Sequence, residues 1–183
     1  AAVEDMMVEL AMMGFTGMML YTEDTYEIEG RPYFGYMRGR YTKDELKELD
    51  AYALSIGIEL NPCIQTLGHL DRVMHWPAYY PVRENDAVIQ PDLEETYVIL
   101  EQMIRAASAP YRSKRIHLGM DEAWGLGLGA HLYRHGYENP QFIMKRHLKR
   151  LLDICEKYGL NAMMWSDMYF QADGLHYHSE KDP

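Results

Sequence analysis

One pattern recurs four times along the chain: apolar residues at helical spacing, a turn signal, and then a short apolar run. In the first repeat, apolar positions between residues 3 and 13 recur every three or four residues and stop at Gly14, and residues 15–21 follow as an apolar run. The later repeats predict strands over residues 58–66, 115–120 and 161–166. Helix followed by strand, four times over, predicts an α/β fold with a parallel sheet.

Three of the predicted helices also carry start signals. Thr42 and Glu45, three residues apart, predict a capping box before the second helix. Asp92, with an acid three residues after it, predicts the start of the third helix. Asn139 followed by Pro140 predicts the N-cap and the first turn of the fourth helix.

Four such units could form a small doubly wound sheet or half of a (β/α)8 barrel. Polar or aromatic residues follow the C-terminal end of all four predicted strands, and this favours the barrel, because barrel enzymes build their sites at that rim from several strands. These rim residues are Glu23, Asp24 and Tyr26 after the first strand, Gln65 and His69 after the second, Asp121, Glu122 and Trp124 after the third, and Trp165, Asp167 and Tyr169 after the fourth.

The glycine-rich run 125–129 does not change this interpretation. It lacks the spacing of dinucleotide-binding loops and the lysine of a P-loop, so we expect a mobile loop over the site and not a phosphate-binding loop. A complete barrel typically needs about 250 residues, whereas this chain has 183. We therefore expect an α/β fold in which residues 1–183 form part of a single TIM-barrel catalytic domain, a partial (β/α)8 barrel of about four βα units.

Both edges of such a partial sheet would be unpaired in an isolated monomer. The missing half of the barrel would then come from the parent chain or from self-association.

Charge and composition exclude two classes of partner. The net charge is −10, the pI is about 5.2, and no basic stripe could neutralise a row of phosphates, so we expect no nucleic-acid partner. The most apolar stretch, residues 6–21, is interrupted by Glu9 and Gly14 and falls short of the roughly 20 apolar residues that span a bilayer, so we expect no membrane partner. Cys63 and Cys155 are isolated and predicted to be reduced and buried. No targeting segment is visible, and we expect a cytoplasmic protein.

Asp121 and Glu122 carry the strongest chemical signal, because two adjacent acids close a predicted strand and Trp124 follows them. Neighbouring side chains on a regular strand point to opposite faces, so the acids can share a pocket only where the strand ends and the backbone turns. Gly119 and Gly125 allow that turn. Adjacent acids are poorly placed to flank a sugar from opposite sides, as ordinary glycosidases require, and this points to a nucleophile supplied by the substrate.

The run from His117 to Trp124, His-Leu-Gly-Met-Asp-Glu-Ala-Trp, resembles the catalytic segment of glycoside hydrolase family 20, the β-N-acetylhexosaminidases. The resemblance implies a retaining, substrate-assisted hydrolysis of a terminal N-acetylhexosamine, with no cofactor. Asp121 would orient and polarise the 2-acetamido group, whose carbonyl oxygen attacks the anomeric carbon. Glu122 would protonate the leaving oxygen as the general acid.

Other segments extend the resemblance in matching order along most of the chain. Trp165 resembles the tryptophan that lines the acetamido pocket of the family, and Asp167 resembles a polar neighbour that could hold sugar hydroxyls. The run Gln65-Thr-Leu-Gly-His-Leu resembles the Gly-His segment whose histidine lies near the bound sugar. The expected substrate-binding residues are His69, Trp124, Trp165, Asp167, Tyr169, Glu23 and Asp24, of which Glu23 and Asp24 lie in a segment that matches only loosely. The arginine that the family places on its first strand and the aromatic residues of its later strands have no clear counterpart here.

Two other classes of function stay open: a non-catalytic carbohydrate-binding barrel, and an unrelated metal-dependent sugar-processing barrel enzyme. Two histidine pairs have metal-like spacing, His131 with His135 and His176 with His178, but neither has a nearby acid in a zinc motif. We therefore expect no metal site. His131, His135 and His147 fall on or near predicted helices, and we expect them at the surface.

Two remaining features have structural interpretations. His117 lies inside a predicted strand, four residues before Asp121, so a structural role is favoured. Trp76, together with Tyr79 and Tyr80, could form a sugar-stacking rim or an aromatic loop packed against the barrel.

Overall fold

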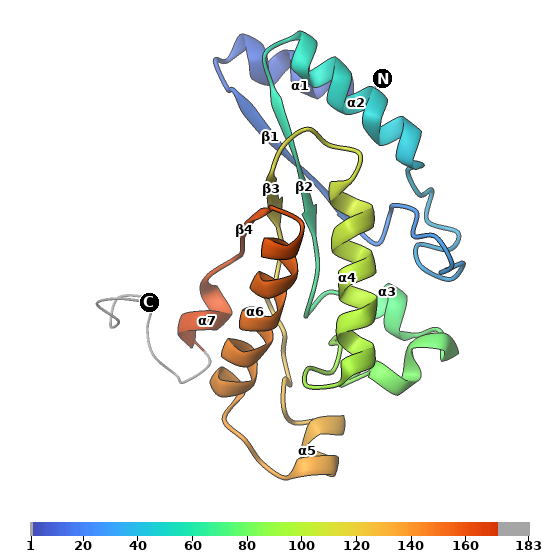
Figure 1. Ribbon diagram of the computed structural model, residues 1–183, viewed down its shortest axis with the longest axis vertical. Helices are drawn as coiled ribbons and strands as arrows, with labels where there is room; N and C mark the ends of the chain where they lie inside the picture. Colours follow the sequence, from blue (N-terminus) through green and yellow to red (C-terminus); the bar gives the residue numbers. More distant parts are fainter. Residues whose placement is uncertain (1, 172–183) are drawn as a thin grey trace.

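The computed structural model describes residues 2–171, in which four parallel strands form one sheet in the order β1-β2-β3-β4 (Figure 1). The strands are β1 (Gly17–Glu23), β2 (Glu59–Ile64), β3 (Arg115–His117) and β4 (Asn161–Met163). The helices are α1 (Ala2–Met12), α2 (Lys43–Ser55), α3 (Asp71–Met74), the 3-10 helix η1 (Pro77–Val82), α4 (Glu94–Ser108), α5 (Ala130–His135), α6 (Pro140–Lys157) and α7 (Asp167–Gln171). The predicted alternation of helix and strand, and the parallel sheet, are confirmed.

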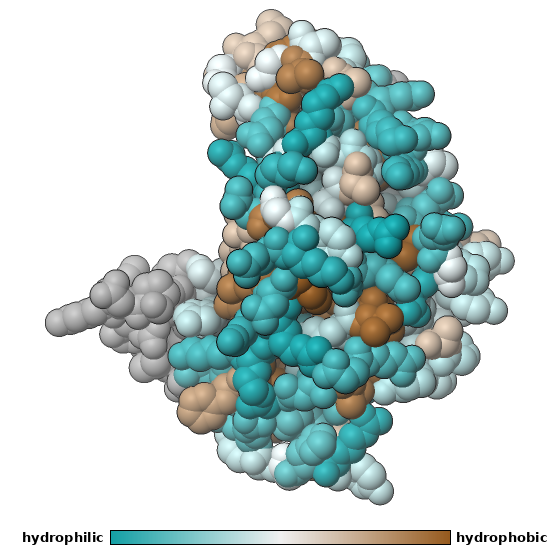
Figure 2. Space-filling model, viewed as in Figure 1, coloured by the Kyte–Doolittle hydropathy of each residue, from teal (hydrophilic) through white to brown (hydrophobic). Residues whose placement is uncertain are grey.

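The long helices α4 and α6 lie side by side over one face of the sheet (Figure 1). Their inward residues are fully buried, among them Leu100 and Met103 of α4 and Ile143 and Leu151 of α6. The outward side of this helical layer is mainly hydrophilic (Figure 2). Burial of these apolar stripes against the sheet stabilises this half of the molecule.

The opposite face of the sheet is more open. Met19 and Tyr21 of β1 and Trp165, just after β4, are exposed large side chains. In the part of the chain that the structure describes, β1 and β4 each have a single strand neighbour. This is the expected geometry of consecutive strands from a barrel whose interior face lacks its other half.

Two of the three predicted helix starts are confirmed. Thr42 and Glu45 form a complete capping box at α2, and the side chain of Asn139 accepts a hydrogen bond from Gln141 N at the start of α6. The prediction for Asp92 was wrong, because α4 begins at Glu94 and Asp92 lies outside the helix with φ +67°. Its carboxylate instead binds Arg146 of α6, with 2.7 Å between Oδ2 and the guanidinium.

The structure confirms the predicted state of both cysteines and bears on the membrane prediction. Cys63 and Cys155 are buried free thiols, and burial raises the pKa of each to about 11. Within residues 2–171, no helix combines the length and the apolar character that crossing a bilayer would require.

Candidate active site

The carboxyl end of β3 turns sharply and carries the acid pair. The predicted strand to residue 120 ends at His117, because Gly119 and Met120 have left-handed backbone, with φ +72° and +74°. Glu122 also has φ +46°, and Gly125 has φ +79°. The predicted turn is therefore confirmed, although two non-glycine residues share the strain with the glycines. Left-handed backbone at such residues is costly and concentrates at functional sites.

His69 brings the two acids to one point. Its Nε2 lies 3.2 Å from Asp121 Oδ2 and 3.5 Å from Glu122 Oε2. The approach depends on Gly68, because a Cβ there would lie 2.6 Å from the backbone oxygen of Asp121. The side chain of Asp121 is 24% exposed and that of Glu122 is 56% exposed, so Glu122 faces the open side of the site.

Gln65 is a site residue that was predicted at the rim but without a role. It directly follows β2, is 1% exposed, and donates from Nε2 to Asp121 Oδ1 at 2.8 Å. The same nitrogen donates to the hydroxyl of Tyr21 at 3.2 Å. Tyr21 is a second residue that sequence reasoning missed. The available signal was its position: it lies on the first strand, on the face opposite to Leu20, which is buried.

Glu23 and Asp24 lie at the same rim but are paired with Arg38. Arg38 contacts Glu23 Oε2 at 3.0 Å and Asp24 Oδ1 at 3.2 Å, and Tyr21 donates to Glu23 Oε1 at 3.1 Å. Asp24 is buried, and burial raises the pKa of its carboxyl while Arg38 opposes that effect. The contact of Asp24 with Arg38 lacks hydrogen-bond geometry, so neither carboxylate oxygen has a hydrogen-bond partner among the described residues. Substrate binding by these two acids stays a prediction.

Trp165 lies against the acid-bearing turn from the side of β4. Its backbone N–H donates to Gly119 O at 3.0 Å, and its indole ring packs on His117, with 4.6 Å between the ring centroids. His117 is buried, and its Nδ1 accepts a hydrogen bond from Gly119 N at 3.1 Å. Burial lowers the pKa of His117, and Asp121 opposes this effect. Its burial and its hydrogen bond agree with a structural role for His117, which stays a prediction.

The other predicted binding residues lie around this centre, and their roles stay predictions. Trp124 is exposed, and its carbonyl oxygen accepts from the side chain of Asn85 at 3.0 Å. Asp167 begins α7, and its Oδ1 is buried without a hydrogen-bond partner among the described residues. Tyr169 lies against α6, with its ring centroid 5.3 Å from Lys145 Nζ.

The glycine-rich segment 125–129 is anchored at its end by a carboxylate. Glu84 accepts hydrogen bonds from Gly129 N at 2.9 Å and from His131 N at 2.8 Å, so an anion from the protein already fills the start of α5. Leu126 within the segment is buried. These contacts agree with the expectation that the segment is not a phosphate-binding loop. The mobility expected of it stays a prediction.

Two of the three histidines expected at the surface are buried, so that expectation was wrong for them. His131 is 3% exposed, and His147 is fully buried, whereas His135 is exposed as expected. His147 Nε2 lies 2.9 Å from Thr66 O, and its Nδ1 lies 3.2 Å from the hydroxyl of Tyr97. The carbonyl must accept, so Nε2 carries the proton. Burial lowers the pKa of His147 to about 4.

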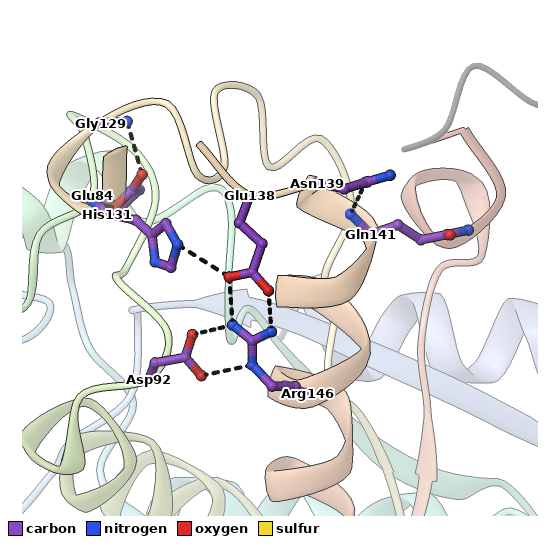
Figure 3. A network of polar contacts seen from close by, with 8 residues as sticks. All are labelled: Glu84, Asp92, Gly129, His131, Glu138, Asn139, Gln141 and Arg146. Atoms are coloured by element: carbon purple, nitrogen blue, oxygen red, sulfur yellow. Dashed lines mark hydrogen bonds and ion pairs between the residues drawn. The ribbon is translucent and has the colours of Figure 1, made fainter. Parts of the chain in front are cut away.

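His131 does have acidic neighbours that its sequence context did not reveal. Its Nε2 lies 3.3 Å from Glu138 Oε2, and these two residues with Asp92 form a group whose spacing could hold a metal ion (Figure 3). The guanidinium of Arg146 lies between the two acids and bonds both, so a cation is already in place. The absence of a metal stays a prediction, and His176 and His178 lie outside the described residues.

The aromatic loop after β2 packs partly inward. Tyr79 is buried in the core, as an aromatic loop packed on the barrel requires, and Tyr80 is exposed beside Arg83. Trp76 instead stacks on Tyr33 from the loop after β1, with 5.1 Å between the ring centroids. A sugar-stacking role for this loop stays a prediction.

Consecutive parallel strands whose carboxyl ends carry an acid pair, a histidine and exposed tryptophans define this chain as part of a (β/α)8-barrel catalytic domain. Residues 16–181 match the family model described as "Glycosyl hydrolase family 20, catalytic domain". The chain belongs to this family.

Relatives and solved structures agree with the family. Hexosaminidase D of Bos taurus is 26% identical over 165 residues, which cover 85% of this chain and 48% of that protein. The chitobiase structure of Flavobacterium johnsoniae superposes with a TM-score of 0.77 at 20% identity, over 91% of this chain and 29% of that one. A mutant Streptomyces plicatus β-hexosaminidase, solved in complex with the product GlcNAc, gives a TM-score of 0.74 at 20% identity, over 91% and 36% of the two chains. This chain therefore spans about half or less of each of these proteins. Its four strands match part of the TIM-barrel fold of the solved structures.

Proposed function

We propose that the protein containing this chain is an exo-acting β-N-acetylhexosaminidase that hydrolyses terminal N-acetylglucosamine or N-acetylgalactosamine with retention of configuration. The proposal rests on one observation: Asp121 and Glu122 both approach the same nitrogen of His69 from the end of one strand. Neither acid then faces the other across a sugar ring, which favours attack by the acetamido group of the substrate. Family membership and the hexosaminidase relatives support this activity.

In the proposed mechanism the two acids have separate tasks. Asp121, held by Gln65 and facing His69, accepts the acetamido N–H and stabilises the charge that develops as the carbonyl oxygen attacks the anomeric carbon. Glu122, on the exposed side, donates a proton to the leaving oxygen, and the bond to the aglycone breaks. A water molecule then opens the cyclic intermediate while Glu122 accepts its proton, which regenerates the acid.

Two substitutions assayed on two substrates test this assignment. The substrates are a disaccharide of N-acetylglucosamine, whose leaving group is poor, and an aryl β-N-acetylglucosaminide, whose leaving group needs little protonation. Glu122→Gln is expected to reduce kcat/KM on the order of 10²–10⁴-fold on the disaccharide and much less on the aryl glycoside. Asp121→Asn is expected to reduce both alike, because ring closure is required whatever the leaving group.

The exposed acids Asp153 and Glu156 on α6 provide matched controls as Asp153→Asn and Glu156→Gln, which should leave both rates unchanged. A defect that depends on the leaving group at Asp121, with a uniform defect at Glu122, would reverse the two roles. Efficient hydrolysis of the corresponding plain glucoside, which has no acetamido group, would exclude substrate assistance.

We also propose that the remaining barrel strands complete the site, from the parent chain or from a second copy of this one. The site uses the ends of four strands only, and remote substrate contacts contribute to transition-state stabilisation. The 183-residue chain alone should therefore turn over substrate very slowly and should associate through its open strand edges. Full activity in a compact monomer, measured by light scattering with a parallel assay, would contradict this. Residence in the cytoplasm stays a prediction from the sequence.

A further inference from the structure

Gln65 is held in one orientation by three hydrogen bonds. Its Oε1 accepts from Met120 N at 3.2 Å, and its Nε2 donates to Asp121 Oδ1 at 2.8 Å and to the hydroxyl of Tyr21 at 3.2 Å. A backbone N–H can only donate, so the end of the amide that faces Met120 must be the oxygen. The end that faces Asp121 is therefore the NH2 group, and both of its protons are used.

The turn after β3 is shaped around this amide. Gly119 has φ +72°, and a Cβ at that position would lie 2.1 Å from Gln65 Oε1. Met120 has φ +74°, which aims its N–H at the same oxygen. Because Gln65 is 1% exposed, water cannot replace these contacts, and each buried polar atom needs its partner.

The orientation of Gln65 restricts what Asp121 can do. Oδ1 faces an N–H donor, so this oxygen can accept a hydrogen bond but cannot carry a proton towards Gln65. Oδ2 faces His69. A neutral amide thus fixes the carboxylate in place without adding a positive charge. A lysine or arginine in its place would add one, which would oppose the positive charge that develops on the acetamido nitrogen.

We propose that Gln65 is the positioning residue for Asp121: it engages Oδ1 as a hydrogen-bond acceptor and thereby orients the carboxylate to accept the acetamido N–H. This inference rests on the proposed function. It adds a residue that holds the acid and does not itself touch the reacting atoms.

The titratable and charged groups that face this pair come from three strands and two loops: Tyr21 and Glu23 from β1, Cys63 from β2, His117 from β3, and His69 and Glu122 from the loops. All of these groups are present both in the wild type and in every Gln65 variant. The ratio of variant to wild-type kcat/KM therefore removes the pH dependence that the two proteins share.

Gln65→Glu gives the sharpest test, because the new side chain has the same shape. The introduced carboxylate would lie against Asp121, and two carboxylates this close share one proton. With one proton, the introduced acid donates to Asp121 as the Gln65 amide does, whereas at higher pH both acids are ionised and repel. The ratio of kcat/KM values on an aryl β-N-acetylglucosaminide should therefore be low at pH 8 and rise by about tenfold per pH unit on acidification, until the pair binds its proton.

Gln65→Met removes the donor but keeps an unbranched side chain of similar volume. Its kcat should fall about 10- to 100-fold with little change in KM, and the tenfold rise per pH unit on acidification expected of Gln65→Glu should be absent, because methionine adds no ionisable group. Gln90→Glu is the matched control, because Gln90 is also fully buried but bonds Arg134, which can accommodate a carboxylate. Its ratio should stay near one at every pH.

The outcomes separate this inference from the proposed function. If the wild-type protein with all barrel strands does not hydrolyse the aryl β-N-acetylglucosaminide, both fail. If it does, but the Gln65→Glu ratio is flat with pH, the positioning role alone is overturned. Should Gln65→Glu not fold, as judged by thermal unfolding, the Gln65→Met variant decides: wild-type kcat there would also overturn the role.

Discussion

Two pairs of carboxylates in the described part of the chain invite comparison, because each pair converges on a single nitrogen-bearing side chain and the two central side chains differ in chemistry. At the rim of the sheet, Asp121 and Glu122 meet the imidazole of His69. Near the start of α6, Asp92 and Glu138 meet the guanidinium of Arg146 (Figure 3). Both groups bring one cationic or protonatable centre to two acids.

The central group decides what each cluster does. Arg146 makes two hydrogen bonds to each acid, and these bonds raise the pKa of the guanidinium further, so its charge is permanent. Such a cluster fixes the loop before α6 against the chain before α4. His69 makes a single contact with each acid, at 3.2 Å and 3.5 Å, and an imidazole, unlike a guanidinium, is a common proton donor and acceptor in enzymes. Two acids are therefore held by a permanent cation in one place and by an imidazole in the other, and the proposed function assigns proton transfer only to the second.

Exchanging the central side chains tests whether they determine the difference between the two clusters. We expect the largest effect, a loss of activity, at the rim. In His69→Arg, a permanent cation would form ion pairs with Asp121 and Glu122, and neither acid could then take part in the reaction. We expect kcat/KM to fall on the order of 10³-fold at every pH, with the unfolding temperature nearly unchanged. Hydrolysis of an aryl β-N-acetylglucosaminide, followed from pH 4 to 8, measures this. Activity within about threefold of wild type would show that a titratable group at this position is not required.

The second prediction concerns His147, which joins the two regions: it follows Arg146 on α6, and its ring binds Thr66 O beside Gln65. The pKa of His147 is about 4 in the folded protein and about 6.5 when unfolded, so the unfolded state binds the proton first as the pH falls. Its contribution is complete above pH 6.5 and should decline by about 3 kcal/mol between pH 6.5 and 4.

Denaturant unfolding of wild type and His147→Gln across this pH range tests the prediction. Glutamine can donate to Thr66 O and does not titrate, so the variant should lose less free energy of unfolding on acidification. Parallel pH curves for the two proteins would show that His147 is not the group responsible.

The smallest expected effect is at Arg146. In Arg146→His, both acids face a shorter, titratable side chain, and the free energy of unfolding should fall by about 1–2 kcal/mol at pH 8, since Arg146 is 45% exposed. The acids should raise the pKa of the new histidine, so its stabilising charge is present at low pH and lost as the pH rises through that pKa. The defect should therefore shrink at pH 5. Arg146→Met is the control and should show no such recovery, while kcat/KM per folded molecule stays unchanged in both.

Much of the fold could be predicted from the sequence because the determining signals are local. The spacing of apolar residues and the glycines set the order of helices and strands, and the capping box at Thr42 needs only residues three apart. The turn that carries Asp121 and Glu122 was also predictable, because Gly119 precedes them at a strand end.

What the sequence did not reveal depends on contacts between distant segments. Asp92 has the residue type of an N-cap, but its partner Arg146 lies 54 residues away. Gln65 is separated from Asp121 by 56 residues, and no local pattern assigns one to the other. His147 had an available signal: it lies four residues after Ile143 and four before Leu151, on the buried stripe of α6. The surface prediction for His147 was wrong because it relied on the polar character of histidine and not on this spacing.

The order of the strands has a consequence for how this polypeptide is made. Each of the four strands pairs only with strands adjacent to it in sequence, so the sheet extends in one direction as the chain lengthens. During synthesis from the amino end, β2, β3 and β4 each emerge after the strand with which they pair, and only the open edge of β1 must wait for a later strand if the barrel closes. The described rim is thus assembled in the order in which it is translated, because His69 leaves the ribosome before Asp121 and Glu122.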